Sequence, residues 1–313
     1  MKRKFSDYLL LYIKGAGMGA ADVIPGVSGG TIAFITGIYE ELIASIKSIG
    51  SKSILKIFKK GGIPEFWSDV NGNFLLTVVL GVGTSVFSLA KLMQYLLSNH
   101  PILVWSFFFG LILSSTLFVG KKVTQWSVGP VVSILLGVAI GYFITAASPT
   151  ETSNSYWFIF LSGAIAICAM ILPGISGSFI LLLLGKYLFM MTAISSLDIP
   201  IILIFLSGAA IGIVAFSNLL SWMLAKYHNI TIAVLTGFMV GSLNKVWPWK
   251  VSVQTYIDSH GMVKPLVESN VLPNTYLSVN GLEPHTVQAI AIACFGALLV
   301  FGFEFLGKKL KKG

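Results

Sequence analysis

Apolar runs long enough to cross a membrane occupy most of this chain. Hydrophobic residues make up 55% of the 313 residues and charged residues only 11%, and the mean hydropathy is +0.86. A soluble domain carries about 25% charged residues, so this chain lacks the polar surface that a soluble core of its size would need. Because a membrane-spanning helix needs about 20 apolar residues, continuous spans are predicted over 73–98, 101–119, 128–147, 200–222, 230–247 and 287–307.

Two further apolar segments, 8–46 and 156–191, are each interrupted by the same motif. Residues 22–31 read DVIPGVSGGT and residues 170–179 read MILPGISGSF, 148 positions apart. Pro and Gly break helices, and the pieces on either side of each motif would be only about 21–26 Å long as helices. Such pieces fall short of a hydrocarbon core of about 30 Å. Each segment is therefore predicted to be a re-entrant hairpin of two half-helices that enters and leaves on one side.

The distribution of positive charge tests this topology. Sixteen of the twenty-one Lys and Arg residues lie in or beside the stretches 1–7, 47–72, 120–127, 223–229 and 308–313, whereas the loops SNHP, SPTETSNSY and SSLDIP have none. Cytoplasmic loops are enriched in Lys and Arg, which predicts that both termini are cytoplasmic. Two full crossings in place of the hairpins would preserve this pattern, but the lengths favour re-entry. The net charge of +9 then comes mostly from an inner face that meets anionic lipid, and no nucleic-acid partner is expected.

The two halves of the chain repeat beyond the motif. Pro, Gly, Ser, Gly, Ile, Gly and Tyr coincide between 22–40 and 170–188, and GLILSS at 110–115 corresponds to GFMVGS at 237–242. Each half is one broken hairpin followed by three spans, and because three is odd the second half starts with the opposite orientation. The predicted fold is an all-α polytopic membrane protein, a single integral membrane domain over 1–313, with inverted repeats at 1–150 and 151–313. Such repeats with broken helices are typical of secondary transporters, which bind substrate near the midplane.

The two breaks are the candidate binding site. Irregular backbone at membrane depth is tolerated only when it is buried in protein or lines a cavity, and a helix N-terminus offers free amides to an anion. A helix kink is the alternative explanation for one such motif, but two in matching positions favour a shared function. The helix-break residues are Pro25, Gly26, Pro173 and Gly174. The candidate residues for binding an anion, a phosphate or a carboxylate, are Ser28, Gly29, Gly30, Thr31, Ser176, Gly177 and Ser178.

Ionisable and polar groups near the breaks are candidates for coupling and for the pathway. Asp22 lies three residues before Pro25 in an apolar setting, where an ionisable group is functional by default. It is a candidate carrier of H⁺ or Na⁺, and the alternatives are a structural cap or a partner of Lys14 or Lys186. Glu40 and Glu41 are further coupling candidates or interfacial groups, and Lys186 either attracts a head group or extends to the interface. Further pathway candidates are Asn218, Ser242, Asn244 and Lys245.

Other chemistry is not indicated by the sequence. Cys168 and Cys294 lie in apolar segments, the four histidines lie in or beside predicted loops, and no metal or cofactor site is expected. The chain has a single arginine, Arg3, and no convergent nucleophile and base, which argues against a lipid phosphatase. A scaffold or sensor would leave the paired motifs unexplained. The polar stretch 248–285 is either a lid or an exposed connector, and a connector is slightly favoured.

Nearly the whole chain resembles a family of bacterial and archaeal polyprenyl-phosphate transporters, long labelled only as a domain of unknown function. The similar stretches are MGAADVIPGVSGGTIAFITGIYE at 18–40, ILPGISGSFILLLLGKY at 171–187, FSNLLSWMLAKYH at 216–228, TGFMVGSLNKVWPWK at 236–250 and EPHTVQAIAIACFGALLVFGFE at 283–304. The resemblance implies a multi-pass protein of the cytoplasmic membrane that is not an enzyme. It also implies return of undecaprenyl phosphate from the outer to the inner leaflet, for reuse in cell-wall polymer synthesis. The expected partners are this lipid carrier and membrane lipids, and a homo-oligomer is compatible with the sequence. The alternative function is a secondary transporter or channel for a small soluble anion.

Overall fold

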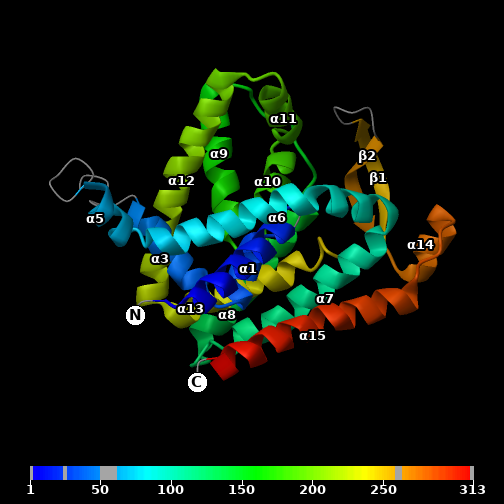
Figure 1. The fold of residues 1–313 in the computed structure, drawn as a ribbon. Coiled ribbons are helices and arrows are strands. Elements are labelled where there is room, and N and C mark those ends of the chain that lie inside the picture. The colour runs from blue at the N-terminus through cyan, green and yellow to red at the C-terminus, as the bar shows by residue number, and fades with distance from the viewer. Residues whose placement is uncertain (1–2, 24–26, 50–61, 258–262, 311–313) are drawn as a thin grey trace.

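The computed structural model describes residues 3–23, 27–49, 62–257 and 263–310. Within these ranges helices dominate, and one antiparallel strand pair joins them (Figure 1). The helices of the first half are α1 (Phe5–Asp22), α2 (Gly29–Ile35), α3 (Tyr39–Ile49), α5 (Gly62–Asp69), α6 (Gly72–Asn99), α7 (Pro101–Gly120) and α8 (Val128–Ala146). The second half has α9 (Tyr156–Ile171), α10 (Gly177–Leu183), α11 (Tyr187–Ser195), α12 (Ile199–Lys226), α13 (His228–Ser242), β1 (Lys250–Ile257), β2 (Val263–Asn270), α14 (Pro273–Asn280) and α15 (Thr286–Leu310).

Four of the described helices, α6, α7, α8 and α12, are long and apolar enough to cross a membrane. The bent pair α10 and α11 is a fifth candidate if it counts as one span. The chain is therefore a polytopic helical membrane protein, as predicted. The span expected over 230–247 is shorter than predicted, because α13 ends at Ser242 and the Lys245 amide then donates to the Ser242 carbonyl in a tight turn.

The second half-helix of each hairpin is broken once more, which the sequence analysis did not predict. In the segment 8–46 the half-helix expected after the break is split into α2 and α3. In the segment 156–191 the corresponding half-helix is split into α10 and α11. Gly37 and Gly185 lie at these second breaks with φ of +75° and +63°, a left-handed conformation that glycine adopts without a Cβ clash. At each glycine the following amide bonds back five residues, from Ile38 to Ala33 and from Lys186 to Leu181. This is the Schellman helix ending, and between α10 and α11 the chain turns by 108°.

The stretch 248–285 contains an antiparallel hairpin and α14, where the sequence analysis expected a lid or a connector. β1 pairs with β2, and Lys250 lies opposite Asn270. Two indole N–H groups hold the ends of the hairpin, since Trp247 donates to the Val271 carbonyl and Trp249 to the Pro284 carbonyl, each at 2.8 Å. Trp249 also packs with Ile102 of α7 in a small apolar cluster. The hairpin is thus attached to the helices at its base.

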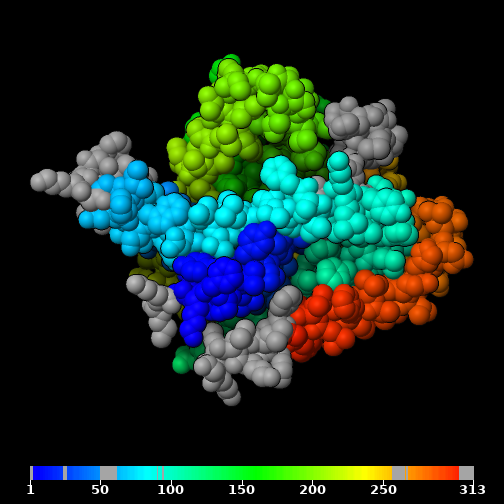
Figure 2. All heavy atoms as spheres, viewed as in Figure 1, coloured from blue at the N-terminus to red at the C-terminus, as the bar shows by residue number. Residues whose placement is uncertain are grey.

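The helices form a body and an arm. We call α9–α12 the arm, because in Figure 1 these green helices rise above the body, which is formed by α1–α3, α6–α8, α13 and α15. The arm contacts the body where α12 packs on α3 and α13 and where α9 meets α2. Figure 2 shows the surface hollowed between the arm and α6. The main apolar core lies in the body and includes Phe34, Tyr39, Phe74, Ile112 and Met239.

Several features of one half recur in the other. α2 and α10 each have seven residues, and α6 and α12 each have 28. α1 packs against α6 as α9 packs against α12, and α7 packs against α15 as α13 packs against α8. The residue that joins α6 to α7 and the residue that joins α12 to α13 also have the same backbone conformation. His100 has φ −135° and ψ 47°, and Tyr227 has φ −130° and ψ 50°.

Candidate functional site where the two helix breaks meet

The backbone amides at the start of α2 donate hydrogen bonds to acceptors from the first half of the chain. The Gly29 amide donates to Asp22 Oδ1 at 2.7 Å, and the Gly30 amide donates to Ser28 Oγ at 3.0 Å. The Thr31 amide donates to the Ser28 carbonyl at 3.0 Å. These amides were predicted to be free, and that prediction is wrong for α2. The Asp22 carboxylate and the Ser28 cap accept the hydrogen bonds of its first turn. Pro25 and Gly26, the predicted break residues of this half, lie outside the described residues.

The two breaks touch each other through hydroxyl groups of the first half. Ser28 Oγ donates to the Met170 carbonyl at 2.8 Å, and Thr31 Oγ1 accepts from the Gly174 amide at 2.9 Å. Both Ser28 and Thr31 are fully buried. The segments that the sequence analysis expected to converge are therefore in direct contact, 142 and 143 positions apart in the chain. Any ligand that enters between them must replace these two bonds.

The start of α10 differs from the start of α2. The hydroxyls of Ser176 and Ser178 bond each other at 2.8 Å. No described residue accepts a hydrogen bond from the Gly177 or Ser178 amide. The reason lies in the sequence, because Met170 stands at the position that corresponds to Asp22. The second break thus retains donors that the first break has already used.

Close packing fixes both breaks. A Cβ on Gly30 would lie 2.5 Å from the Ile171 carbonyl oxygen, and a Cβ on Gly177 would lie 2.6 Å from the Ala166 carbonyl oxygen. Gly174 has φ of +90°, and its backbone faces Ser242 of α13. Backbone therefore approaches backbone here more closely than any side chain would permit. Ser242, a predicted pathway residue, lies at the second break.

The remaining predicted residues are dispersed. Glu41 accepts both Arg3 bonds at 2.6 Å and a bond from Asn71 at 2.8 Å, so it is held in an ion pair, while Glu40 is exposed. Asn218 lies on the exposed face of α12 and bonds the Val214 carbonyl of its own helix. The backbone carbonyl and the side-chain oxygen of Asn244 both accept from Asn270 of β2. Among the proposed coupling groups, Asp22 bonds a residue of a break, the Gly29 amide.

Lys186 has a structural position in the arm. Its side chain is 2% exposed, and its ammonium donates to the Thr152 carbonyl at 2.6 Å and to Asn154 Oδ1 at 2.7 Å. The adjoining Thr150 amide donates to the Leu183 carbonyl at 2.9 Å. Lys186 thus fixes the loop before α9 to the break between α10 and α11. Head-group attraction and an interfacial position were the two expectations for Lys186, and its ammonium is instead bonded within the protein.

Replacing Lys186 with methionine is expected to lower the free energy of unfolding by about 2 kcal/mol, because two acceptors of a charged donor lose their partner. Thermal melting in detergent micelles measures the loss. Lys226→Met is the matched control, since Lys226 is exposed on α12, and it should melt like the unmodified protein. A Lys186→Met variant of full stability that no longer transports would instead place Lys186 in the substrate path.

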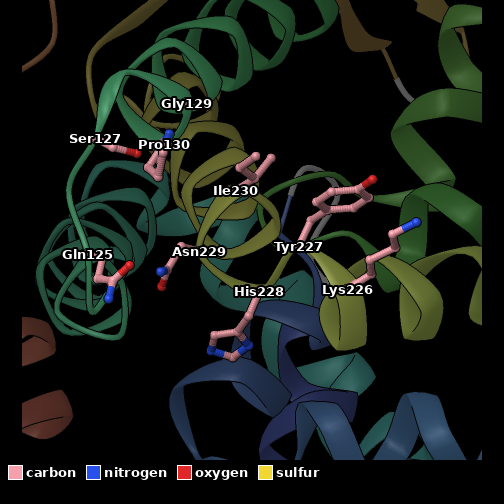
Figure 3. A pocket seen from close by; sticks show the side chains of 9 residues that line it. All are labelled: Gln125, Ser127, Gly129, Pro130, Lys226, Tyr227, His228, Asn229 and Ile230. Carbon is pink, nitrogen blue, oxygen red and sulfur yellow. The ribbon is translucent and has the colours of Figure 1, made fainter.

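A shallow cavity of about 390 Å³ lies where α12 joins α13, away from the breaks. Figure 3 shows Gln125 and Ser127 from the loop before α8 on one side and the residues from Lys226 to Ile230 on the other. Asn229 Oδ1 joins the two segments by accepting from the Thr124 amide at 3.0 Å. The cavity therefore marks the packing of two helix starts, and no predicted site residue lines it.

The long apolar helices and the two contacting breaks are those of a multi-pass helical membrane protein whose helices are interrupted where its halves meet. Comparison with known families then identifies it further. A family model described as undecaprenyl phosphate translocase-like matches residues 18–264. The chain belongs to this family.

Two curated relatives support the assignment. A protein of Vibrio cholerae named polyprenyl-phosphate transporter is 44% identical over 309 residues, which cover 99% of this chain and all of the relative. A protein of Staphylococcus aureus with the same name is 35% identical over 271 residues, which cover 78% of this chain and 91% of the relative. No solved structure matches the chain. The family and both relatives are transporters by name, in agreement with the prediction that the chain is not an enzyme.

Proposed function

We propose that this protein carries polyprenyl phosphate across the cytoplasmic membrane, with the phosphate passing between the two helix breaks. The observation that carries the proposal is the contact of the breaks with each other, through Ser28 on the Met170 carbonyl and Thr31 on the Gly174 amide. These are polar bonds at the junction of two apolar halves, where a phosphate could replace each partner. The names of the two relatives supply the substrate.

The proposed architecture is an inverted repeat in which 1–150 and 151–313 each contribute a re-entrant hairpin. The matching lengths of α2 and α10, the matching glycine turns at Gly37 and Gly185, and the exchanged pairing of α7 with α15 and α13 with α8 support it. Repeats of this kind change access by moving one half against the other around a fixed site. The hollow between the arm and α6 (Figure 2) is the side on which the two halves are apart, and an isoprenoid tail could remain there in lipid.

The phosphate ligands in this proposal are hydroxyls and amides. Within the junction, the Ser176 and Ser178 hydroxyls and the Gly177 amide bind the phosphate before the donors of the first break, because no described residue of the first half competes for that amide. Ser28 and Thr31 follow when their bonds across the junction open, and Gly29 and Gly30 when Asp22 and Ser28 release their amides. α2 and α10 are only seven residues long, so the donors themselves rather than long helix dipoles attract the anion.

The proposal includes a direction of lipid transport and an orientation of the protein in the membrane. The Lys and Arg distribution supports a cytoplasmic position for both termini. Recycling of the carrier for cell-wall polymer synthesis would require movement from the outer to the inner leaflet. In this proposal the donors of the second break, at Ser176, Gly177 and Ser178, bind the phosphate. Asp22 couples its passage to H⁺ or Na⁺.

The test uses purified protein in liposomes that contain undecaprenyl phosphate, with a membrane-impermeant probe of exposed phosphate and a parallel assay of soluble-anion uptake. The unmodified protein should accelerate exchange of the lipid between leaflets. Thr31→Val keeps the side-chain volume but removes the hydroxyl, and it should slow exchange about tenfold, the effect of one hydrogen bond to a charged group.

Thr84→Val is the matched control. The Thr84 hydroxyl is exposed on α6 and bonds the Leu80 carbonyl of its own helix, so the variant should exchange lipid at the original rate. Uptake of the soluble anion without lipid exchange would replace the proposal by a small-anion transporter that uses the same breaks. Equal slowing by both threonine variants would show that the junction is not the path.

A further inference from the structure

Two lysines and one glutamate meet beside the second break, at the base of the β-hairpin. Glu268 Oε2 lies 3.5 Å from Lys245 Nζ and 3.7 Å from Lys250 Nζ. Lys250 lies opposite Asn270 in the register and Glu268 lies opposite Ser252, so Lys250 and Glu268 are diagonal neighbours on one face of the hairpin. A single carboxylate oxygen is therefore shared by two ammonium groups. With both lysines protonated, the three residues have a net charge of +1.

Aromatic rings from two different helices hold the ammonium groups in place. Lys250 Nζ lies 3.9 Å from the centre of the Trp105 ring on α7, and Lys245 Nζ lies 4.7 Å from the centre of the Phe179 ring on α10. The face of an aromatic ring attracts a cation, and more strongly where water is excluded. Phe179 directly follows Ser178 in the chain, so Lys245 connects this cluster with the donors of the second break.

The arrangement costs stability as it stands. The Lys250 side chain is 6% exposed, and its ammonium also donates to the Lys245 carbonyl at 2.7 Å. Burial lowers the pKa of the Lys250 ammonium to about 7, Glu268 opposes this shift, and the neighbouring Lys245 adds to it. Both distances to Glu268 exceed the roughly 2.7–2.9 Å of a well-formed charge-assisted hydrogen bond. A second buried cation without a close counter-ion lowers the stability of the fold, because its loss of hydration is not compensated.

We propose that Lys245 and Lys250 form a receiving site for a phosphate monoester, in which Glu268 holds the place of one phosphate oxygen. Several phosphate oxygens can contact both ammonium groups closely, which one carboxylate oxygen does not achieve at 3.5 and 3.7 Å. Trp105 and Phe179 keep the two cations apart and in position. The identity of the ligand as a lipid head group rests on the proposed function, whereas the phosphate chemistry rests on the cluster.

The test is equilibrium binding of farnesyl phosphate to the purified full chain in detergent, measured by titration calorimetry, with inorganic phosphate and farnesol as parallel ligands. Glu268→Gln removes the competing anion and should tighten farnesyl phosphate binding about tenfold. Lys245→Gln should weaken binding about tenfold, since one of two charged donors is lost. Glu151→Gln, a change of an exposed glutamate in the loop before α9, should leave binding unchanged.

The charge-balanced double variant Lys245→Gln with Glu268→Gln should return the affinity to near its original value. A Glu268→Gln variant that binds no tighter than the unmodified protein would overturn the proposal, and if that variant does not fold, unchanged affinity in Lys245→Gln would do so. Tightening for inorganic phosphate as strongly as for farnesyl phosphate would support the site and assign it to free anion. Because binding is measured without transport, failure of the transport test with Thr31→Val leaves this result unaffected.

Discussion

Replacing Gly30 with alanine is expected to stop lipid transport and to lower the free energy of unfolding by about 1–3 kcal/mol. The new Cβ would lie 2.5 Å from the Ile171 carbonyl oxygen and 3.0 Å from the Met170 carbonyl oxygen. These are backbone atoms at the end of α9, so they cannot turn away as a side chain could. The two breaks must separate, and the Ser28 and Thr31 bonds across the junction break with them. Thermal melting and lipid exchange in liposomes measure the two effects.

Gly83→Ala is the matched control for this experiment. Gly83 lies on α6 with nothing within 4 Å of a Cβ, and alanine in a helix interior is favoured by about 1 kcal/mol over glycine. Its transport should be unchanged and its stability equal or higher. Gly30→Ser copies the residue at the corresponding position of the second motif, Ser178, and should nevertheless fail like Gly30→Ala. Full transport by either Gly30 variant would show that the breaks do not need this contact.

Replacing Asp22 with asparagine is expected to remove the pH or Na⁺ dependence of transport while the fold is retained. The Asn oxygen can still accept from the Gly29 amide, which Asp22 holds at 2.7 Å, but it cannot gain or lose a proton. A single titrating carboxylate changes a rate by at most about tenfold per pH unit on its sloping limb, and the variant should lose that limb. Initial rates of lipid exchange across a pH series, with NaCl replaced by choline chloride in a second series, measure the change.

Two comparisons separate coupling from capping by Asp22. Asp22→Ala removes the acceptor as well and should destabilise the protein by about 1 kcal/mol, the usual cost of a lost helix cap. Glu40→Gln changes an exposed carboxylate at the start of α3 and should keep the original pH dependence. If the pH profile of Asp22→Asn superimposes on that of the unmodified protein, Asp22 is a structural cap and another group carries the ion.

The meeting of the two breaks was predictable, because helix breakers inside apolar runs are rare and this chain repeats one. The motif with Ser28 and the motif with Ser176 stand in matching positions, and the structure brings them into contact. The state of their donors was not predictable. Asp22 reaches the Gly29 amide from seven positions away, and Ser28 reaches the Met170 carbonyl from 142, so the occupied amides of the first break depend on chain folding. The second glycine turns, at Gly37 and Gly185, could have been found in the sequence as a repeated Gly followed by an apolar residue or Lys and then Tyr.

The membrane environment, most of the long helices and the two breaks follow from the sequence alone, because hydropathy and the backbone limits of Pro and Gly act locally. The predicted span 101–119 and the observed α7 (Pro101–Gly120) differ by one residue at one end for that reason. Which polar groups meet depends instead on how the chain packs in three dimensions. Lys250, Glu268 and Trp105 come from a hairpin and a helix more than a hundred positions apart, and nothing in their local sequence marks them. Charges and rings interact according to their distance in space, and Lys250 reaches Trp105 only once the base of the hairpin packs on α7.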